Sequence, residues 1–308
     1  MNIAVLGVGS IGSVLATSLA EAGHEIHLHV RGERGAQLAL TGLVIDGHRT
    51  ETVQSNRFSW SFDEHALPPE RRTWADAVVV TSKAADVHRL LTVAREAVKD
   101  DGLVVVMANG LGHLEAAASA VGHERAAVAT TTNGAFRLPS GKVRWVGKGV
   151  VHCGVSPLGD ARRAEAFVRV LNGAGLDTDL HEDVQGMVWE KLLINLAVNP
   201  VAALGGLTNG ALLSPELFST CMEVYREAAQ VARLERIDVP DESTFERRLR
   251  TVLEVTSHNE CSMLQDLKAG RATEMKWLNQ AVVSLAERHG LRLPLNQALA
   301  ALIQACRP

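Results

Sequence analysis

The chain has 308 residues, of which 46% are hydrophobic and 21% are charged, and its formal net charge is −4. This is the composition of a globular protein with one large domain or two domains, whose core needs no disulfide or metal to hold it. The small negative charge excludes a broad basic surface of the kind that binds nucleic acid or anionic membranes. We therefore expect neither a nucleic-acid partner nor a membrane partner.

The cysteines and the apolar segments indicate a cellular compartment. The cysteines are far apart and form no C-x-x-C pair, which favours free thiols in a reducing environment. The four are Cys153, Cys221, Cys261 and Cys306. The first apolar strand begins directly after the start of the chain, without the pattern of a secretory leader. The longest apolar stretch, residues 192–207, contains two asparagines and a proline, so it is a poor membrane span. We expect a cytoplasmic protein.

Short apolar strands alternate with helical patterns in the first half of the chain. We expect strands at residues 3–6, 25–30, 77–81, 103–107 and 126–131, with helices at 11–21, 87–98 and 114–120. Continuous apolar strands separated by helices predict a parallel sheet covered on both faces. The Val- and Gly-rich stretch 143–153 is typical of an antiparallel hairpin at one edge of that sheet.

Helical periodicity dominates the second half, from residue 184 to residue 303. Breaks are expected at Pro200, Gly205-Gly206, Asn209-Gly210, Pro240 and Pro294. We predict an α/β protein with a parallel-sheet domain at residues 1–181 and an all-α substrate and catalytic domain at residues 182–308. An active site would lie in a cleft at the carboxyl ends of the strands, between the two domains.

A glycine-rich loop follows the first strand and opens the first helix. Glycines in a G-x-G-x-x-G motif permit a tight turn, close approach of the backbone to a pyrophosphate, and close packing of helix on strand. The phosphates then meet the positive end of the helix. The motif alone is weak, and a structural glycine turn is the alternative, but its strand–turn–helix context favours a Rossmann-type NADP-binding domain. The expected cofactor contacts are Gly7, Val8, Gly9, Ser10, Ile11 and Gly12.

The end of the second strand distinguishes between the two nicotinamide cofactors. NAD sites usually carry Asp or Glu there, whereas this chain carries Arg31. A guanidinium pairs with a 2′-phosphate through two parallel hydrogen bonds, so NADPH (NADP+) is the preferred cofactor. Lys83 and Asn109 follow two further strands and could reach the same ligand, with a surface lysine and an ordinary Asn-Gly turn as the alternatives.

A line of polar residues runs along an otherwise apolar helix. Lys191, Asn195 and Asn199 are four residues apart, so they share one helix face. The residues between them are apolar, which predicts a buried helix whose polar groups need partners. Structural hydrogen bonds or a bound substrate could supply those partners.

A second polar line has the same spacing at His258, Ser262 and Asp266, and Glu274 follows at the start of an expected helix over residues 274–288. A solvated helix face is the simpler interpretation, particularly for His258. Ser262 is harder to explain in this way because Met263 and Leu264 follow it.

Together these motifs resemble those of the ketopantoate reductase (2-dehydropantoate 2-reductase) family, in order and across nearly the whole chain. The C-terminal motifs Ser-Met-Leu-Gln-Asp at 262–266 and Gly-Arg-Ala-Thr-Glu at 270–274 are more specific than the glycine loop. The remaining motifs of the resemblance are Gly7–Gly12, Arg31, Lys83, Asn109-Gly110, Trp189-Glu190-Lys191, Asn195 and Asn199.

The resemblance implies roles for individual residues. Lys191 would be the general acid, and Glu274 would act beside it as a second catalytic residue that also contacts the cofactor. Asn195, Asn199, Asn209 and Ser262 would bind a small 2-oxo acid together with Lys191. Lys83, Asn109 and Ala135 would contact NADP with the glycine loop and Arg31. Pantothenate biosynthesis follows from the resemblance alone, which also leaves room for a homodimer.

The sequence departs from the family pattern at Met275-Lys276, where the family commonly has Ile-Asp, and within residues 131–135. A related NADP-dependent dehydrogenase acting on another 2-oxo or 3-hydroxy acid is therefore an alternative. A non-catalytic NADPH-binding sensor is an alternative of another class. His24, His27 and His29 lie close together, but no Cys/His cluster completes a ligand set, so no metal site is expected.

Overall fold

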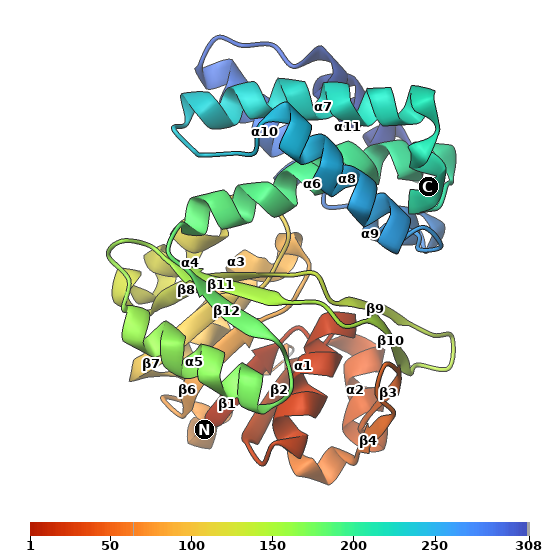
Figure 1. Ribbon diagram of the computed structural model, residues 1–308. Helices are drawn as coiled ribbons and strands as arrows, with labels where there is room; N and C mark the ends of the chain where they lie inside the picture. Colours follow the sequence, from red (N-terminus) through yellow and green to blue (C-terminus); the bar gives the residue numbers. More distant parts are fainter. Residues whose placement is uncertain (64, 307–308) are drawn as a thin grey trace. The chain divides into compact units, whose positions relative to one another are not determined.

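The computed structural model describes residues 1–63 and 65–306 and contains two compact units (Figure 1). The first unit comprises the described residues of 1–108 and 112–184. The second comprises the described residues of 185–308 together with the short segment 109–111, which the sequence analysis did not assign to it.

An eight-stranded sheet forms the centre of the first unit. Its order is β12-β11-β8-β7-β6-β1-β2-β5, and the six strands from β8 to β5 are parallel. The strands are β1 (Asn2–Leu6), β2 (Glu25–Val30), β5 (Phe58–Phe62), β6 (Ala75–Val80), β7 (Val98–Val106), β8 (Ala126–Thr131), β11 (Val151–Val155) and β12 (Thr178–His181). The chain builds β2 and β5 on one side of β1 and then β6 on the other, so the topological switch point lies at the carboxyl end of β1.

Helices cover this sheet because its central strands are apolar on both faces. Ile3, Val5 and Val79 belong to a buried cluster that also contains residues of α1 and α5, while α3 and α4 pack against β6, β7 and β8. The helices of the unit are α1 (Ser10–Glu21), α2 (Gly32–Thr41), α3 (Ala84–Ala97), α4 (His113–Val121) and α5 (Ala161–Gly173), with 3-10 turns η1 (Ser55–Arg57), η2 (Pro69–Arg71) and η3 (His123–Arg125).

A second, four-stranded sheet corrects one prediction. The expected hairpin at 143–153 is wrong, because its two halves lie in different sheets: β10 pairs with β9 and β3, whereas β11 pairs with β8 and β12. The order of the smaller sheet is β4-β3-β10-β9. Its strands are β3 (Leu43–Gly47), β4 (Glu51–Val53), β9 (Gly134–Arg137) and β10 (Val143–Gly147). Trp145 of β10 is buried against the core that contains α1, and this burial fixes β10 away from β11.

The second unit is helical and packs around α6 (Val184–Gly205), in which Trp189 and Leu193 are buried. The other helices are α7 (Pro215–Leu234), α8 (Glu242–Val255), α9 (Ser262–Lys268), α10 (Asn279–Arg288) and α11 (Pro294–Ala305), with 3-10 turns η4 (Asn209–Leu213) and η5 (Met275–Trp277). Within the described residues, α6 alone has the length and hydropathy of a membrane span. Much of it is buried in this unit, as in the core helix of a soluble protein.

The predicted break at Pro200 is also wrong, because α6 continues through that residue. A proline removes one backbone donor and leaves the carbonyl group four residues earlier without its helical partner. That carbonyl belongs to Leu196, and the buried Asn279 side chain donates to it at 3.4 Å. The helix ends instead at Gly205, followed by Gly206 with a φ of +64°.

Candidate functional site

The glycine loop has the three features that a dinucleotide-binding turn requires. Gly7 makes the tight turn with a φ of +85°. A Cβ on Gly12 would lie 2.4 Å from Thr81 Oγ1 and 2.9 Å from the Gly7 carbonyl oxygen, so only glycine lets α1 pack this closely. A Cβ on Gly9 would meet its nearest neighbour at 4.0 Å, which leaves the backbone open to a ligand. The loop therefore fits a bound pyrophosphate at the N-terminus of α1.

Gly12→Ala tests this packing. We expect the free energy of unfolding to fall by about 1–3 kcal/mol, the usual cost of overpacking, and the dinucleotide dissociation constant to rise. Thermal unfolding and a fluorescence titration with NADPH measure the two effects. The control is Gly173→Ala, because a Cβ there meets nothing within 4 Å. Unchanged stability and binding in Gly12→Ala would contradict the proposed role of the loop.

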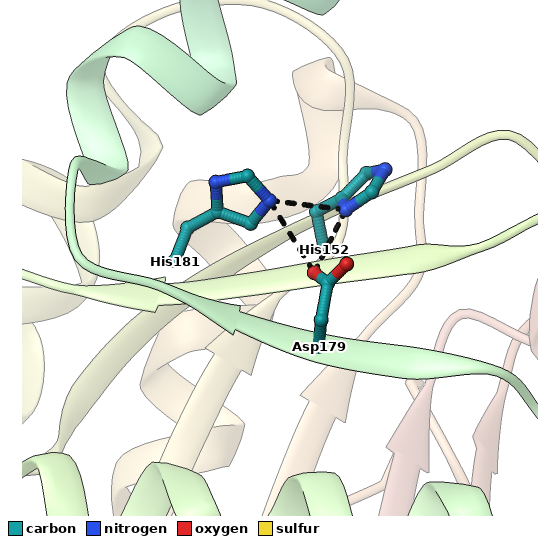
Figure 2. A group of neighbouring side chains, drawn as sticks. All are labelled: His152, Asp179 and His181. Carbon is teal, nitrogen blue, oxygen red and sulfur yellow. Dashed lines mark hydrogen bonds and ion pairs between the residues drawn. The ribbon is translucent and has the colours of Figure 1, made fainter.

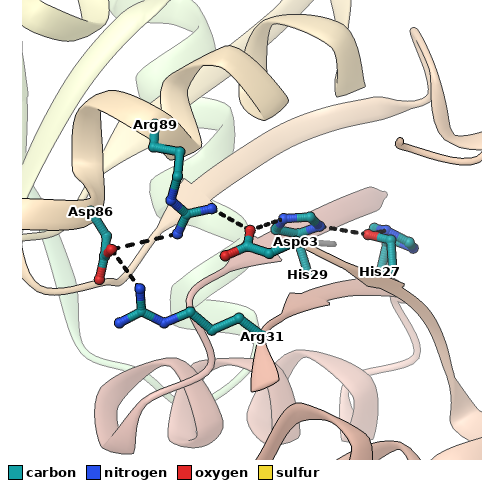
Figure 3. Close-up of polar contacts among 7 residues, drawn as sticks. His27, His29, Arg31, Asp63, Asp86 and Arg89 are labelled. Carbon is teal, nitrogen blue, oxygen red and sulfur yellow. Dashed lines mark hydrogen bonds and ion pairs between the residues drawn. The ribbon is translucent and has the colours of Figure 1, made fainter. Parts of the chain in front are cut away.

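Arg31 lies at the start of α2, directly after β2, in a chain of polar contacts (Figure 3). Its guanidinium is 62% exposed and pairs with Asp86 at 2.7 Å. Asp86 also lies 3.5 Å from Arg89, which pairs with Asp63. Asp63 Oδ1 in turn lies 2.7 Å from His29 Nε2. Exposed pairs contribute little stability, so Arg31 can exchange Asp86 for an anionic ligand at small cost.

Buried histidines continue this chain into the sheet. His29 Nδ1 and His27 Nε2 both bond to Ser61 Oγ, at 2.8 and 2.7 Å. Burial, assisted by the nearby Arg71 and by His29, lowers the pKa of His27 to about 3, so this imidazole is neutral at physiological pH. These histidines are satisfied by serine and carboxylate partners, and the structure gives them a structural role.

Three further basic or small residues belong to the first unit. Lys83 is exposed at the N-terminus of α3, two residues after Thr81, and Ala135 lies in β9. Sequence reasoning missed Arg34, whose Nε and Nη2 are buried without a hydrogen-bond partner among the described residues. Burial and the neighbouring Arg137 lower the pKa of Arg34 to about 10. A partly buried cation beside another cation is stabilised when an anion binds.

The predicted polar line occupies one face of α6. Lys191 and Asn195 are half-buried and Asn199 is buried, while Leu192, Leu193 and the other intervening residues pack into the helical core. Burial lowers the pKa of Lys191 to about 8, and the negative charge of Glu274 opposes this shift. The ammonium is therefore poised to release a proton near neutral pH.

The segment 109–111 brings Asn109, another predicted site residue, to Glu274. Asn109 Nδ2 donates to Glu274 Oε2 at 3.0 Å, and Leu111 N donates to the Trp277 carbonyl oxygen at 3.2 Å. Gly110 and Trp277 are in close contact, because a Cβ on Gly110 would lie 2.5 Å from the Trp277 carbonyl oxygen. Glu274 is buried and precedes η5, so the single helix expected over 274–288 is divided into η5 and α10.

The remaining predicted substrate residues meet around the loop after α8. Asn209 N donates to the Asn259 carbonyl oxygen at 2.9 Å, and its Nδ2 donates to Thr256 Oγ1 at 2.8 Å. The buried Asn209 Oδ1 has no hydrogen-bond partner in the described parts of the chain, so it can accept from a ligand. Cys261, which caps the helix that Ser262 begins, contacts the Asn199 carbonyl oxygen through Sγ at 3.5 Å.

The second polar line is not one helix face. His258 lies in a turn between α8 and α9, whereas Asp266 is buried and pairs with Arg271 at 3.1 Å. Thr256 and Cys261 were missed by sequence reasoning, because no spacing links them to Asn209 or Asn199. The helical unit thus combines a partly desolvated ammonium, a buried carboxylate, and several amide and hydroxyl groups. This set can bind a carboxylate substrate and donate a proton to a carbonyl oxygen.

Comparisons with known proteins identify the family and the fold of this chain. The family model described as ketopantoate reductase PanE/ApbA matches residues 3–157, and the model of its C-terminal part matches residues 183–307. A 2-dehydropantoate 2-reductase from Pyrococcus horikoshii is 31% identical over 99% of this chain and 97% of its own length. A solved PanE/ApbA family ketopantoate reductase from Ralstonia eutropha JMP134 has a TM-score of 0.86 at 26% identity, over 99% of this chain and 98% of that chain. A D-mandelate dehydrogenase solved with NADH and anilino(oxo)acetate has the same fold, with a TM-score of 0.90 at 22% identity, over 99% and 98% of the two chains.

Proposed function

Because the chain belongs to the ketopantoate reductase family, we propose that it catalyses the NADPH-dependent reduction of 2-dehydropantoate to pantoate in the cytoplasm. The observation that carries this proposal is Lys191, an ammonium whose pKa is about 8 and which is influenced by the carboxylate of Glu274. A sensor that only binds NADPH has no need for such an acid. The reaction would serve pantothenate biosynthesis.

Each polar residue of the candidate site in the helical unit has a role in this reaction. Lys191 donates a hydrogen bond to the ketone oxygen, stabilises the charge that develops there, and then gives up its proton. Glu274 keeps Lys191 protonated, and Asn109 orients that carboxylate. Ser262 binds the substrate carboxylate, while Asn195, Asn199 and Asn209 orient the rest of the molecule.

The first unit would hold NADPH, which supplies the hydride when it is bound. The glycine loop would bind the pyrophosphate, and Lys83 and Ala135 would contact the nucleotide. We assign the 2′-phosphate to Arg31, whose guanidinium is exposed at the N-terminus of α2. Arg34, one turn later, supports this preference because it is a partly buried cation whose Nε and Nη2 have no hydrogen-bond partner among the described residues.

Replacing Arg31 with alanine should change the cofactor preference. Because charge-assisted hydrogen bonds contribute about 1.5–3 kcal/mol, kcat/KM for NADPH should fall roughly 10- to 100-fold, while that for NADH changes little. Steady-state kinetics with both cofactors measure the ratio. The control is Arg95→Ala, an exposed arginine elsewhere in the same unit. An equal loss with both cofactors would argue against 2′-phosphate recognition by Arg31.

A comparison of kcat/KM across 2-oxo acids tests the proposed substrate. We expect 2-dehydropantoate to exceed pyruvate, 2-oxoisovalerate and phenylglyoxylate, with NADPH oxidation followed by absorbance. A higher value for another acid would assign the chain to a different reductase with the same mechanism. NADPH oxidation with none of these acids would refute the catalytic proposal.

A further inference from the structure

Two histidines and an aspartate, none of which has a role assigned above, converge on the edge of the large sheet. His152 lies in β11, and Asp179 and His181 lie in the edge strand β12 (Figure 2). The parallel register places His152 opposite Asp179, and His181 is two residues further along β12. Residues two apart in a strand point to the same face, so the three side chains share one face.

The opposite face of these strands is covered by the core. Val151 and Cys153 belong to the buried cluster that contains α5, and Leu180 packs against it. The alternation of the strands therefore turns the histidine–aspartate cluster away from α5. Its side chains remain accessible, with exposed fractions of 29% for His152, 50% for Asp179 and 39% for His181.

The distances within the cluster approach those between the ligand atoms of one metal ion. His152 Nδ1 lies 2.8 Å from Asp179 Oδ1, His181 Nε2 lies 3.4 Å from the same oxygen, and the two nitrogens are 3.2 Å apart. Zinc binds such atoms at about 2.0–2.2 Å in tetrahedral geometry, which separates neighbouring ligand atoms by roughly 3.3–3.6 Å. Opening the 2.8 Å contact by about 0.5–0.8 Å, with smaller shifts at the other two, would complete three corners of a tetrahedron.

The protonation of the two imidazoles decides whether this triangle holds hydrogen bonds or can bind a cation. If both nitrogens carry protons, both N–H groups can donate to Asp179 Oδ1, because a carboxylate oxygen accepts two hydrogen bonds. If either nitrogen is unprotonated, its lone pair faces the carboxylate oxygen. When both nitrogens are unprotonated, the three atoms present lone pairs to one another, and a cation between them makes all three contacts favourable.

We propose that His152 Nδ1, His181 Nε2 and Asp179 Oδ1 bind one divalent zinc-type ion, with the remaining coordination positions open to water. Two imidazoles and one carboxylate suit zinc and exclude magnesium and calcium, which prefer oxygen ligands. The ion would cross-link the edge strand β12 to β11, just before the chain enters α6 at Val184. This departs from the absence of a metal site expected from the sequence, where these residues are 27 and 29 positions apart.

Metal binding to the full-length, chelator-treated protein tests this proposal without any turnover assay. Isothermal titration should give one Zn²⁺ per chain, and Co²⁺ should give the intense visible bands of low-coordinate cobalt. Zn²⁺ should also raise the midpoint of thermal unfolding, because it binds the folded state preferentially. Neither Mg²⁺ nor Ca²⁺ should reproduce these effects.

Variants identify the ligands. His152→Ala, His181→Ala and Asp179→Asn should each weaken Zn²⁺ binding by more than about 10-fold, the lower end of the cost of losing even an outer-shell partner. His123→Ala, an exposed histidine of the same unit, should bind like the parent protein. Circular dichroism without metal checks that each variant folds. Failure of the parent protein to bind Zn²⁺, or equal binding by folded ligand variants, would overturn the assignment, and neither result bears on the reductase proposal.

Discussion

Lys191→Ala should lower kcat for reduction of the 2-oxo acid by about 10²- to 10⁴-fold, the usual contribution of a positioned general acid. The ammonium supplies both a proton and positive charge at the developing alkoxide, and water cannot replace a group held in that position. The dissociation constant of NADPH should change little, because the cofactor contacts of the first unit are unaltered. Stopped-flow turnover and a binding titration measure the two quantities separately.

The pH profile makes this assignment specific. A general acid acts in its protonated form, and the pKa of Lys191 is about 8. The kcat of the parent enzyme should therefore be maximal below pH 8 and fall as the pH rises through that value. Lys191→Arg retains the positive charge but does not give up a proton in this range, so its low activity should lack this fall.

Stability distinguishes loss of chemistry from loss of fold. Burial holds the pKa of Lys191 below the value of an unfolded lysine, so the protonated amine destabilises the folded state at neutral pH. Lys191→Met should consequently unfold at the same or a higher temperature than the parent protein. The control is Lys268→Ala, an exposed lysine of the same unit. Near-normal turnover by a folded Lys191→Ala enzyme would remove Lys191 from the mechanism.

Local patterns predicted the parts of this protein that depend on neighbouring residues in sequence. The glycine loop was recognisable because strand, turn and helix follow one another directly, and Lys191, Asn195 and Asn199 because helical spacing places them on one face. Partners distant in sequence were not recognisable. Asp86 is 55 residues from Arg31, and Asn109 is 165 residues from Glu274. Only the folded chain brings such pairs within hydrogen-bond distance.

Two of the errors of the sequence analysis have the same origin. Pro200 predicted a helix end because it lacks the backbone donor that the Leu196 carbonyl needs. Asn279, 83 residues from Leu196 in sequence, donates to that carbonyl instead. The Val- and Gly-rich stretch 143–153 predicted a hairpin because its strands are adjacent in sequence, whereas burial of Trp145 places the first strand in the smaller sheet. In each case a tertiary contact overrode a correct local preference.

Glu274→Gln should move the pH dependence of kcat to lower pH. The negative charge of Glu274 raises the pKa of Lys191, against the larger effect of burial. Without that charge, the pKa of Lys191 should fall further below 8, and an opposite charge nearby typically contributes about one unit or more. For a fall of one unit we expect roughly a 3-fold loss of kcat at pH 7.5, largely recovered at more acidic pH, where the lysine is again protonated.

The glutamine variant preserves shape and can still accept the hydrogen bond from Asn109, so charge is the main change at this position. The matched control is Glu190→Gln, which neutralises the exposed carboxylate next to Lys191 that pairs with Arg248 and should leave the profile unchanged. A profile that does not move in Glu274→Gln would show that this carboxylate does not set the protonation of the lysine. A profile that moves to higher pH would reverse the sign of the interaction, and Lys191 could then not be the acid that Glu274 keeps charged.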